Sequence, residues 1–200
     1  MAETKHATAF ISGPLDPTDE YFDLHYKPKI DAAISENHDF IIGPVRGIDA
    51  LALQYLISQN VTPTRITIYM AAFECASTTW RSSFTDLGVN VFVVEEAVTT
   101  RDRDAAMTRD SDYDILRYRS EAEAKELYGS SWWPRVSNTE MNERRRKGIL
   151  SQAYTLEEGH ASEQVEGGHE EQNLGMGKST KAENAGKFKR SKLRKLFGKD

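Results

Sequence analysis

Short, almost fully apolar runs alternate along the first 150 residues with longer segments in which apolar residues recur every three or four positions. Such runs are typical of strands buried on both faces, and such spacing is typical of amphipathic helices. The runs predict strands at about 9–11, 39–43, 65–70, 90–94 and 113–116. The periodic segments predict helices at about 21–34, 46–59, 77–87, 101–110, 121–128 and 139–150. Pro28 lies inside the first of these helices and predicts either a kink or the start of a second helix.

Strands that alternate with helices predict a parallel sheet covered by helices on both faces. The expected fold class is therefore α/β, a three-layer, Rossmann-like domain over residues 7–150 with a mostly parallel sheet of about five strands. Composition changes after this domain. Residues 151–186 are rich in Glu, Gly, Gln, Asn and Ser, which predicts a disordered acidic and polar linker. The predicted disordered tail then ends in a basic segment over 187–200.

The basic tail holds seven Lys or Arg residues, interleaved with Phe188, Leu193, Leu196 and Phe197. This pattern suits contact with an anionic membrane or a nucleic acid, a nuclear localisation signal, or simply a solubilising chain end. The total charge of −5 includes +1 from residues 151–200, so the predicted domain carries −6. An acidic domain is a poor non-specific binder of nucleic acid.

The cysteine content and the first residues of the chain predict the cellular compartment of the protein. Cys75 is the one cysteine, which excludes an internal disulfide and fits a reducing compartment. The first six residues are polar and lack the apolar stretch of a secretory signal. We therefore expect an intracellular protein, cytoplasmic or nuclear. No His or Cys residues have metal-ligand spacing, and no metal or other cofactor is expected.

In an open parallel sheet, ligands bind beyond the carboxyl ends of the strands. The loop after the second predicted strand carries Gly43 and Gly47 and leads straight into a helix, whose first amides and dipole favour an anion. Arg46 adds a cation, and Asp49 either caps the helix or accepts a ribose hydroxyl. The sequence thus predicts phosphate or ligand binding by Ser12, Gly13, Pro14, Gly43, Pro44, Arg46, Gly47, Ile48, Asp49, Arg81 and Arg101.

Several of these segments resemble the SLOG superfamily, which includes DNA-processing protein A, Lonely Guy phosphoribohydrolases and relatives of nucleoside deoxyribosyltransferases. The similar pieces are Ser12-Gly13-Pro14, the turn leading into Gly47-Ile48-Asp49-Ala50-Leu51-Ala52, the stretch from Arg101 to Thr108 with Ser111-Asp112-Tyr113, and Thr139-Glu140-Met141-Asn142 with Arg144-Arg145-Arg146. The resemblance spans about residues 8–147. It implies a Rossmann-like fold and a nucleotide or nucleotide-derived ligand.

Some members of this superfamily hydrolyse or transfer at a nucleotide's N-glycosidic bond with a carboxylate at a strand end, and others only bind. Cleavage builds positive charge on the ribose, which a carboxylate stabilises or attacks while an acid protonates the base. The catalytic candidates are Glu74 first, then Glu95 and Asp112, with Tyr26 or Asp16 holding the sugar. The chain lacks the Pro-Gly-Gly-x-Gly-Thr-x-x-Glu motif of Lonely Guy enzymes and the Gly-x-Gly-x-x-Gly fingerprint of dinucleotide dehydrogenases.

Three functions follow as hypotheses: a nucleotide N-glycosidase or (deoxy)ribosyltransferase-like hydrolase, a non-catalytic nucleotide sensor or regulatory module, and a nucleic-acid-binding module. The acidic domain argues against the third. The basic run Arg144–Lys147 is either a solvated helix face or a source of one phosphate-binding arginine. Trp132-Trp133-Pro134 either plugs the core or forms a patch covered by a second subunit. A homo-oligomer is expected by analogy with proteins of this fold.

Overall fold

The computed structural model describes residues 6–76 and 78–149. The predicted linker 151–186 and basic tail 187–200 lie outside the described residues. The described chain contains strands β1 (Thr8–Ser12), β2 (Asp39–Ile42), β3 (Ile66–Ala71), β4 (Asn90–Val94) and β5 (Tyr113–Leu116). Its α-helices are α1 (Asp19–His25), α2 (Lys27–Ser35), α3 (Ile48–Ser58), α4 (Thr78–Thr85), α5 (Thr100–Arg109), α6 (Glu121–Tyr128) and α7 (Asn138–Arg146). Short 3-10 turns lie at Pro63–Arg65, Glu74–Ala76 and Gly129–Ser131.

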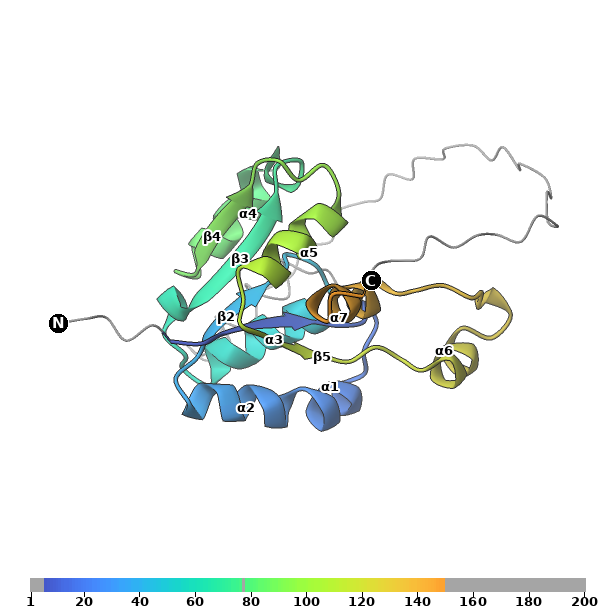
Figure 1. The fold of residues 1–200 in the computed structure, drawn as a ribbon. Helices are drawn as coiled ribbons and strands as arrows, with labels where there is room; N and C mark the ends of the chain where they lie inside the picture. Colours follow the sequence, from blue (N-terminus) through green and yellow to red (C-terminus); the bar gives the residue numbers. More distant parts are fainter. Residues whose placement is uncertain (1–5, 77, 150–200) are drawn as a thin grey trace, which may run out of the picture.

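The five strands form one sheet in the order β4-β3-β2-β1-β5, and every neighbouring pair is parallel (Figure 1). The chain therefore adds strands in one direction from β1 to β4 and then returns to the other side of β1. The switch point lies between β1 and β5, where Ser12 stands beside Leu116. In sheets of this kind, the crevice for a ligand opens at this point, beyond the carboxyl ends of the strands. The predicted α/β fold class is confirmed.

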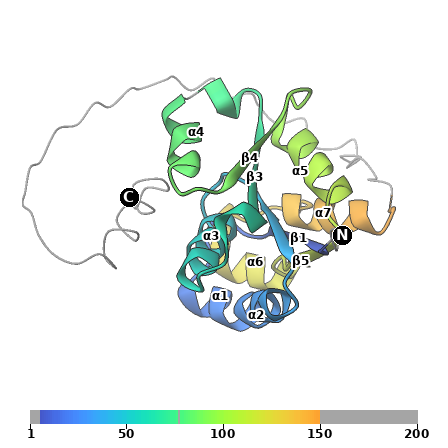
Figure 2. The same ribbon diagram turned by 90° about the vertical axis from the view of Figure 1, so that its left-hand side faces the viewer.

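Helices cover both faces of the sheet, which makes three layers (Figures 1 and 2). On one face, α1 to α4 enclose the larger core, whose fully buried side chains include Ile11, Phe40, Ile68 and Phe84. On the other face, Ala106 and Met107 of α5 pack against Phe10, Ile41 and Tyr69. Helix α7 lies beside α5 and β5, and α6 stands apart from the body and buries none of its residues.

Two local features settle points that the sequence left open or placed differently. Pro28 lies in the first turn of α2, so it starts a second helix rather than kinking one. Helix α3 begins at Ile48, later than the predicted residue 46, because Gly47 has a φ of +87° and cannot be helical. Ser137 caps α7 by accepting a hydrogen bond from the Glu140 amide. None of the helices in the described segments is long and apolar enough to cross a membrane.

Candidate functional site

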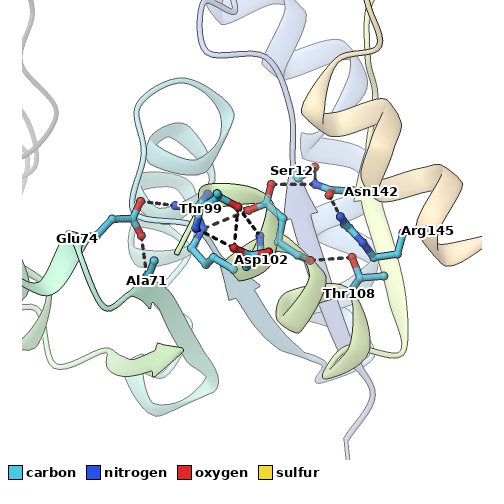
Figure 3. A network of polar contacts seen from close by, with 10 residues as sticks. Ser12, Ala71, Glu74, Thr99, Asp102, Thr108, Asn142 and Arg145 are labelled. Carbon is cyan, nitrogen blue, oxygen red and sulfur yellow. Dashed lines mark hydrogen bonds and ion pairs between the residues drawn. The ribbon is translucent and has the colours of Figure 1, made fainter. Parts of the chain in front are cut away.

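A cluster of buried polar side chains lies at the carboxyl edge of the sheet (Figure 3). Its members come from different elements: Ser12 ends β1, Glu74 follows β3, Arg103 and Asp104 belong to α5, and Asn142 belongs to α7. Asp49, in the first turn of α3, is buried next to them. Charged groups are costly to bury unless they are paired, so a cluster of this kind marks a candidate site.

Arg103 is the centre of the cluster. Its Nη1 donates to Glu74 Oε1 at 2.5 Å, and its Nε and Nη2 both donate to Asp104 Oδ1, at 3.1 and 2.8 Å. The guanidinium side chain is only 5% exposed. Burial lowers the pKa of Arg103, but the carboxylates of Asp104 and Glu74 raise it by more, so the group stays charged. Arg103 therefore holds two carboxylates in fixed positions.

Glu74, the first catalytic candidate from the sequence, belongs to this cluster. Its Oε2 accepts a hydrogen bond from the Ala71 amide at 2.8 Å, and its Oε1 accepts from Arg103. Burial raises the pKa of Glu74, while Arg103 and the Ala71 amide pull it back down. Protein donors thus engage both oxygens, which ties the turn after β3 to α5.

Asp49 lies beneath the loop that follows β2. A Cβ built on Gly43 would come within 2.4 Å of Asp49 Oδ2, and the Gly43 amide donates a hydrogen bond to this carboxyl. Burial raises the pKa of Asp49 to about 8, against the lowering effect of Arg103, and the nearby Asp104 and Glu74 raise it further. Asp49 is therefore protonated at neutral pH. It points into the protein and neither caps α3 nor faces solvent.

Asp104 and Asn142 extend the network to β1. Among the described residues, Asp104 Oδ2 has one long contact, 3.5 Å from Asn142 Nδ2, and that amide also donates to Ser12 Oγ at 3.3 Å. Asn142 Oδ1 accepts from Arg145 Nη1 at 2.8 Å. The polar network therefore runs from β3 across α5 to α7 and the end of β1 (Figure 3).

Helix caps explain why α5 and α7 present these side chains. Thr99 and Asp102 form a capping box, in which each side chain accepts a hydrogen bond from the other residue's amide. The box fixes the start of α5, and Arg103 and Asp104 then share its buried face with Met107. In α7, Asn142 lies on the same buried side as Thr139. One helical turn separates such residues, so both face the sheet.

The other two carboxylate candidates lie away from this cluster. Glu95 is exposed in the turn after β4. Asp112 precedes β5, at the amino edge of the sheet, where its Oδ2 accepts from the Thr8 amide at 2.7 Å. The arginines predicted to bind a ligand, Arg46, Arg81 and Arg101, are all exposed. The structure therefore brings Glu74 and Asp49 together with Ser12 but leaves these five residues outside the cluster.

The loops after β1 and β2 pack against each other. The Ile48 amide donates to the Pro14 carbonyl at 3.1 Å, and a Cβ on Gly47 would lie 2.4 Å from that same oxygen. Gly13 is equally close to its neighbours, since a Cβ there would lie 2.3 Å from the Tyr26 hydroxyl. The glycines thus have a packing role of their own, and one of the first amides of α3 is already engaged. Pro44 is buried within the second loop.

Tyr26 and Asp16, the two residues predicted to hold a sugar, instead make hydrogen bonds to neighbouring segments of the protein. The Tyr26 hydroxyl donates to the carbonyls of Ser12 and Arg117, at 3.0 and 2.9 Å, and burial raises the pKa of this phenol. Asp16 accepts from Arg119 at 2.6 Å and from Tyr128 at 3.1 Å, which anchors α6. Tyr26 is fully buried, whereas Asp16 is exposed beside these two partners.

The basic run of α7 is paired within the protein. Arg144 bonds to Glu140 one turn earlier, Arg145 bonds to Asn142, and Arg146 bonds to Asp114 on β5. Arg145 is the member that touches the polar cluster. The three arginines of the run are thus tied to carboxylates and to Asn142 of the same domain.

Arg103, Asp104 and Asn142 lie in segments that resemble the SLOG superfamily, but the sequence predicted no role for them. Arg103 and Asp104 stand in a run of charges, Arg101-Asp102-Arg103-Asp104, which is typical of an exposed helix start. The spacing of Arg103 and Asp104 from Met107, one helical turn later, was the sequence signal that could have predicted their burial.

Within residues 6–76 and 78–149, no group of three His, Cys, Asp or Glu side chains is arranged to hold a metal ion. Neither a protein-family model, nor a curated protein, nor a solved structure matches the chain. The resemblance to the SLOG superfamily consequently stays a hypothesis that rests on the quoted motifs.

Proposed function

We propose that this protein binds a nucleotide or nucleotide-derived small molecule at the carboxyl edge of its sheet and acts on the N-glycosidic bond. In such a reaction the bond from C1′ to the base breaks, the base leaves with the electron pair and takes a proton, and C1′ receives an oxygen from water or another acceptor. A fixed carboxylate near C1′ lowers the barrier, because positive charge develops on the sugar.

The observation that carries the proposal is the arrangement of Asp104. Arg103 fixes its Oδ1 with two hydrogen bonds, while within the described part of the chain its Oδ2 has one contact, of 3.5 Å. Among the three carboxyl groups around Arg103, Glu74 has both oxygens bound to protein donors and Asp49 is protonated. Asp104 therefore replaces Glu74 as the preferred carboxylate, and it lies beside Ser12 at the switch point.

The charge of the cluster supports contact with a sugar rather than with a phosphate. Around Arg103, the acidic side chains of Glu74, Asp104 and Asp49 outnumber this guanidinium, while Arg145 reaches the cluster through Asn142. A negative site stabilises a cationic sugar and repels a phosphate. We place the phosphate further along the edge, near the start of α3, where Arg46 is exposed.

A non-catalytic nucleotide sensor is the second candidate. It is favoured by the engagement of both Glu74 oxygens and by the small exposed fraction of the Asp104 side chain, 10%. Such a protein would use the same edge for binding and leave the ligand intact.

The test uses the full-length chain in a thermal-shift screen with nucleoside mono-, di- and cyclic phosphates, followed by chromatography of each stabilising mixture. A ligand that binds the native state raises the melting temperature. We expect at least one nucleotide to stabilise the protein and to release its free base. Asp104→Asn should abolish release, and the thermal shift should persist.

Asp110→Asn is the matched control, because Asp110 caps the opposite end of the same helix. It should leave both stabilisation and product release unchanged. A nucleotide that stabilises the chain but stays intact would favour the sensor. No stabilisation by any nucleotide would contradict nucleotide binding at this edge.

A further inference from the structure

Strand β4 is an edge strand whose outer side no described element covers (Figures 1 and 2). It pairs with β3 on one side only, and none of its five residues is buried. After Asn90 the strand reads Val91-Phe92-Val93-Val94, without a charge or a proline. Phe92 packs against Tyr69, with ring centroids 4.7 Å apart, yet remains 45% exposed because α5 lies over β3 rather than β4.

The opposite edge of the same sheet is protected. Strand β5 carries the charged Asp114, which binds Arg146 of α7 at 2.8 Å, and α7 packs against this strand. Inward charges and a covering helix are ways in which proteins prevent an edge from pairing with another strand. Strand β4 carries no charged side chain, and although α4 packs against one face of it, no described element pairs with its outer edge. An apolar edge with free backbone groups is a template for strand addition.

We propose that β4 pairs with β4 of a second copy of this chain, antiparallel about a two-fold axis at Phe92, so that two sheets join into one. This inference stands apart from the proposed function. With the two-fold axis at Phe92, each of the five residues Asn90–Val94 lies opposite a residue of the partner strand. Val91 faces Val93 of the partner subunit, and the two Phe92 side chains face each other, so apolar residues meet on both faces of the joined sheet.

The charges next to β4 favour this arrangement over a parallel one. Glu95 and Glu96 follow the strand directly. Antiparallel pairing places them opposite Val89 and Gly88 of the partner subunit, whereas parallel pairing in register would bring like charges together. A two-fold interface also closes on itself, while a parallel, head-to-tail contact does not.

Two measurements on the full-length chain test the pairing. Light scattering after size exclusion should give twice the 22.6 kDa of one chain, and Phe92→Lys should shift the mass to that of a monomer. Oxidation of Phe92→Cys should give a covalent dimer, because directly opposite residues come within disulfide reach. A mixture of Val91→Cys and Val93→Cys chains should also cross-link, more than either variant alone.

The controls are Val98→Lys and Val98→Cys, since Val98 is apolar and 82% exposed but lies outside β4. The unmodified chain, whose one cysteine is Cys75, controls for oxidation elsewhere. Circular dichroism of Phe92→Lys verifies that the variant is folded. A monomeric natural chain, a dimer that survives Phe92→Lys, or equal cross-linking through Val98→Cys would each overturn the proposal.

Discussion

At the scale of single residues, the site depends on carboxyl groups whose surroundings differ although they are close together. Arg103 binds Glu74 and Asp104 directly, whereas Asp49 accepts the Gly43 amide and keeps its proton. Buried carboxyls of different protonation state are a recurring way in which one site holds both an acid and an anion. The protonation of Asp49 is therefore a property to measure before any ligand is known.

Asp49→Asn should make the protein more stable relative to the natural chain as pH rises. The folded pKa of Asp49 is about 8 and the ordinary value is 3.8, so between these limits the folded protein holds a proton that the unfolded chain releases. The free energy of unfolding then falls as pH increases, by at most about 1.4 kcal/mol per pH unit from this group. Asparagine does not titrate and keeps an oxygen for the Gly43 amide.

Urea unfolding at pH 5, 6, 7 and 8 measures this difference. The exposed Asp31→Asn serves as the control, and its difference from the natural chain should stay nearly constant with pH. A constant difference for Asp49→Asn as well would show that Asp49 is ionised in the folded protein.

At the scale of elements, the sequence predicted the strands and most helices because each has its own apolar pattern. Strands such as Phe40–Ile42 are buried on both faces, and this leaves a clear signal. The cluster around Arg103 was only partly predictable. Arg103, Asp104 and Asn142, which had no predicted role, come from α5 and α7. Their burial depends on how these helices cross the sheet edge, which no local pattern encodes. Glu74 and Ser12 were found because they directly follow or end strands.

Helix α7 gives a prediction at this scale. Arg146 makes four hydrogen bonds to Ser111 and Asp114, which attach α7 to β5. Among residues 6–76 and 78–149, the Arg144 side chain bonds within its own helix, to Glu140. Arg146→Ala should lower the free energy of unfolding by about 2–3 kcal/mol, because it leaves the Asp114 carboxylate without its partner. Arg144→Ala should cost about 0.5 kcal/mol or less.

Urea unfolding of both variants under the same conditions makes the comparison. Both changes remove an arginine from the same helix, so the loss of charge and of helix propensity is matched. Equal losses of stability would mean that the contacts between Arg146 and β5 contribute nothing beyond those of a surface pair.

At the scale of the whole molecule, strand order determines which parts of the chain must be present together. Strand β1 lies between β2 and β5, and the pairing of Ala9 with Tyr113 joins segments at opposite ends of the domain. A chain that ends after Asp110 lacks β5 and α7. Strand β1 then loses one of its two neighbouring strands, and Asp104 loses its contact with Asn142. We expect this chain to show no cooperative unfolding transition in urea, because central core strands then lie at an open edge.

A chain that ends after Ile149 keeps every described element and should unfold with the midpoint of the full-length protein. Circular dichroism and tryptophan fluorescence should report the same midpoint for it. If instead the chain ending after Ile149 unfolds without cooperativity, the predicted domain boundary near residue 150 is wrong, and residues beyond it contribute to the fold.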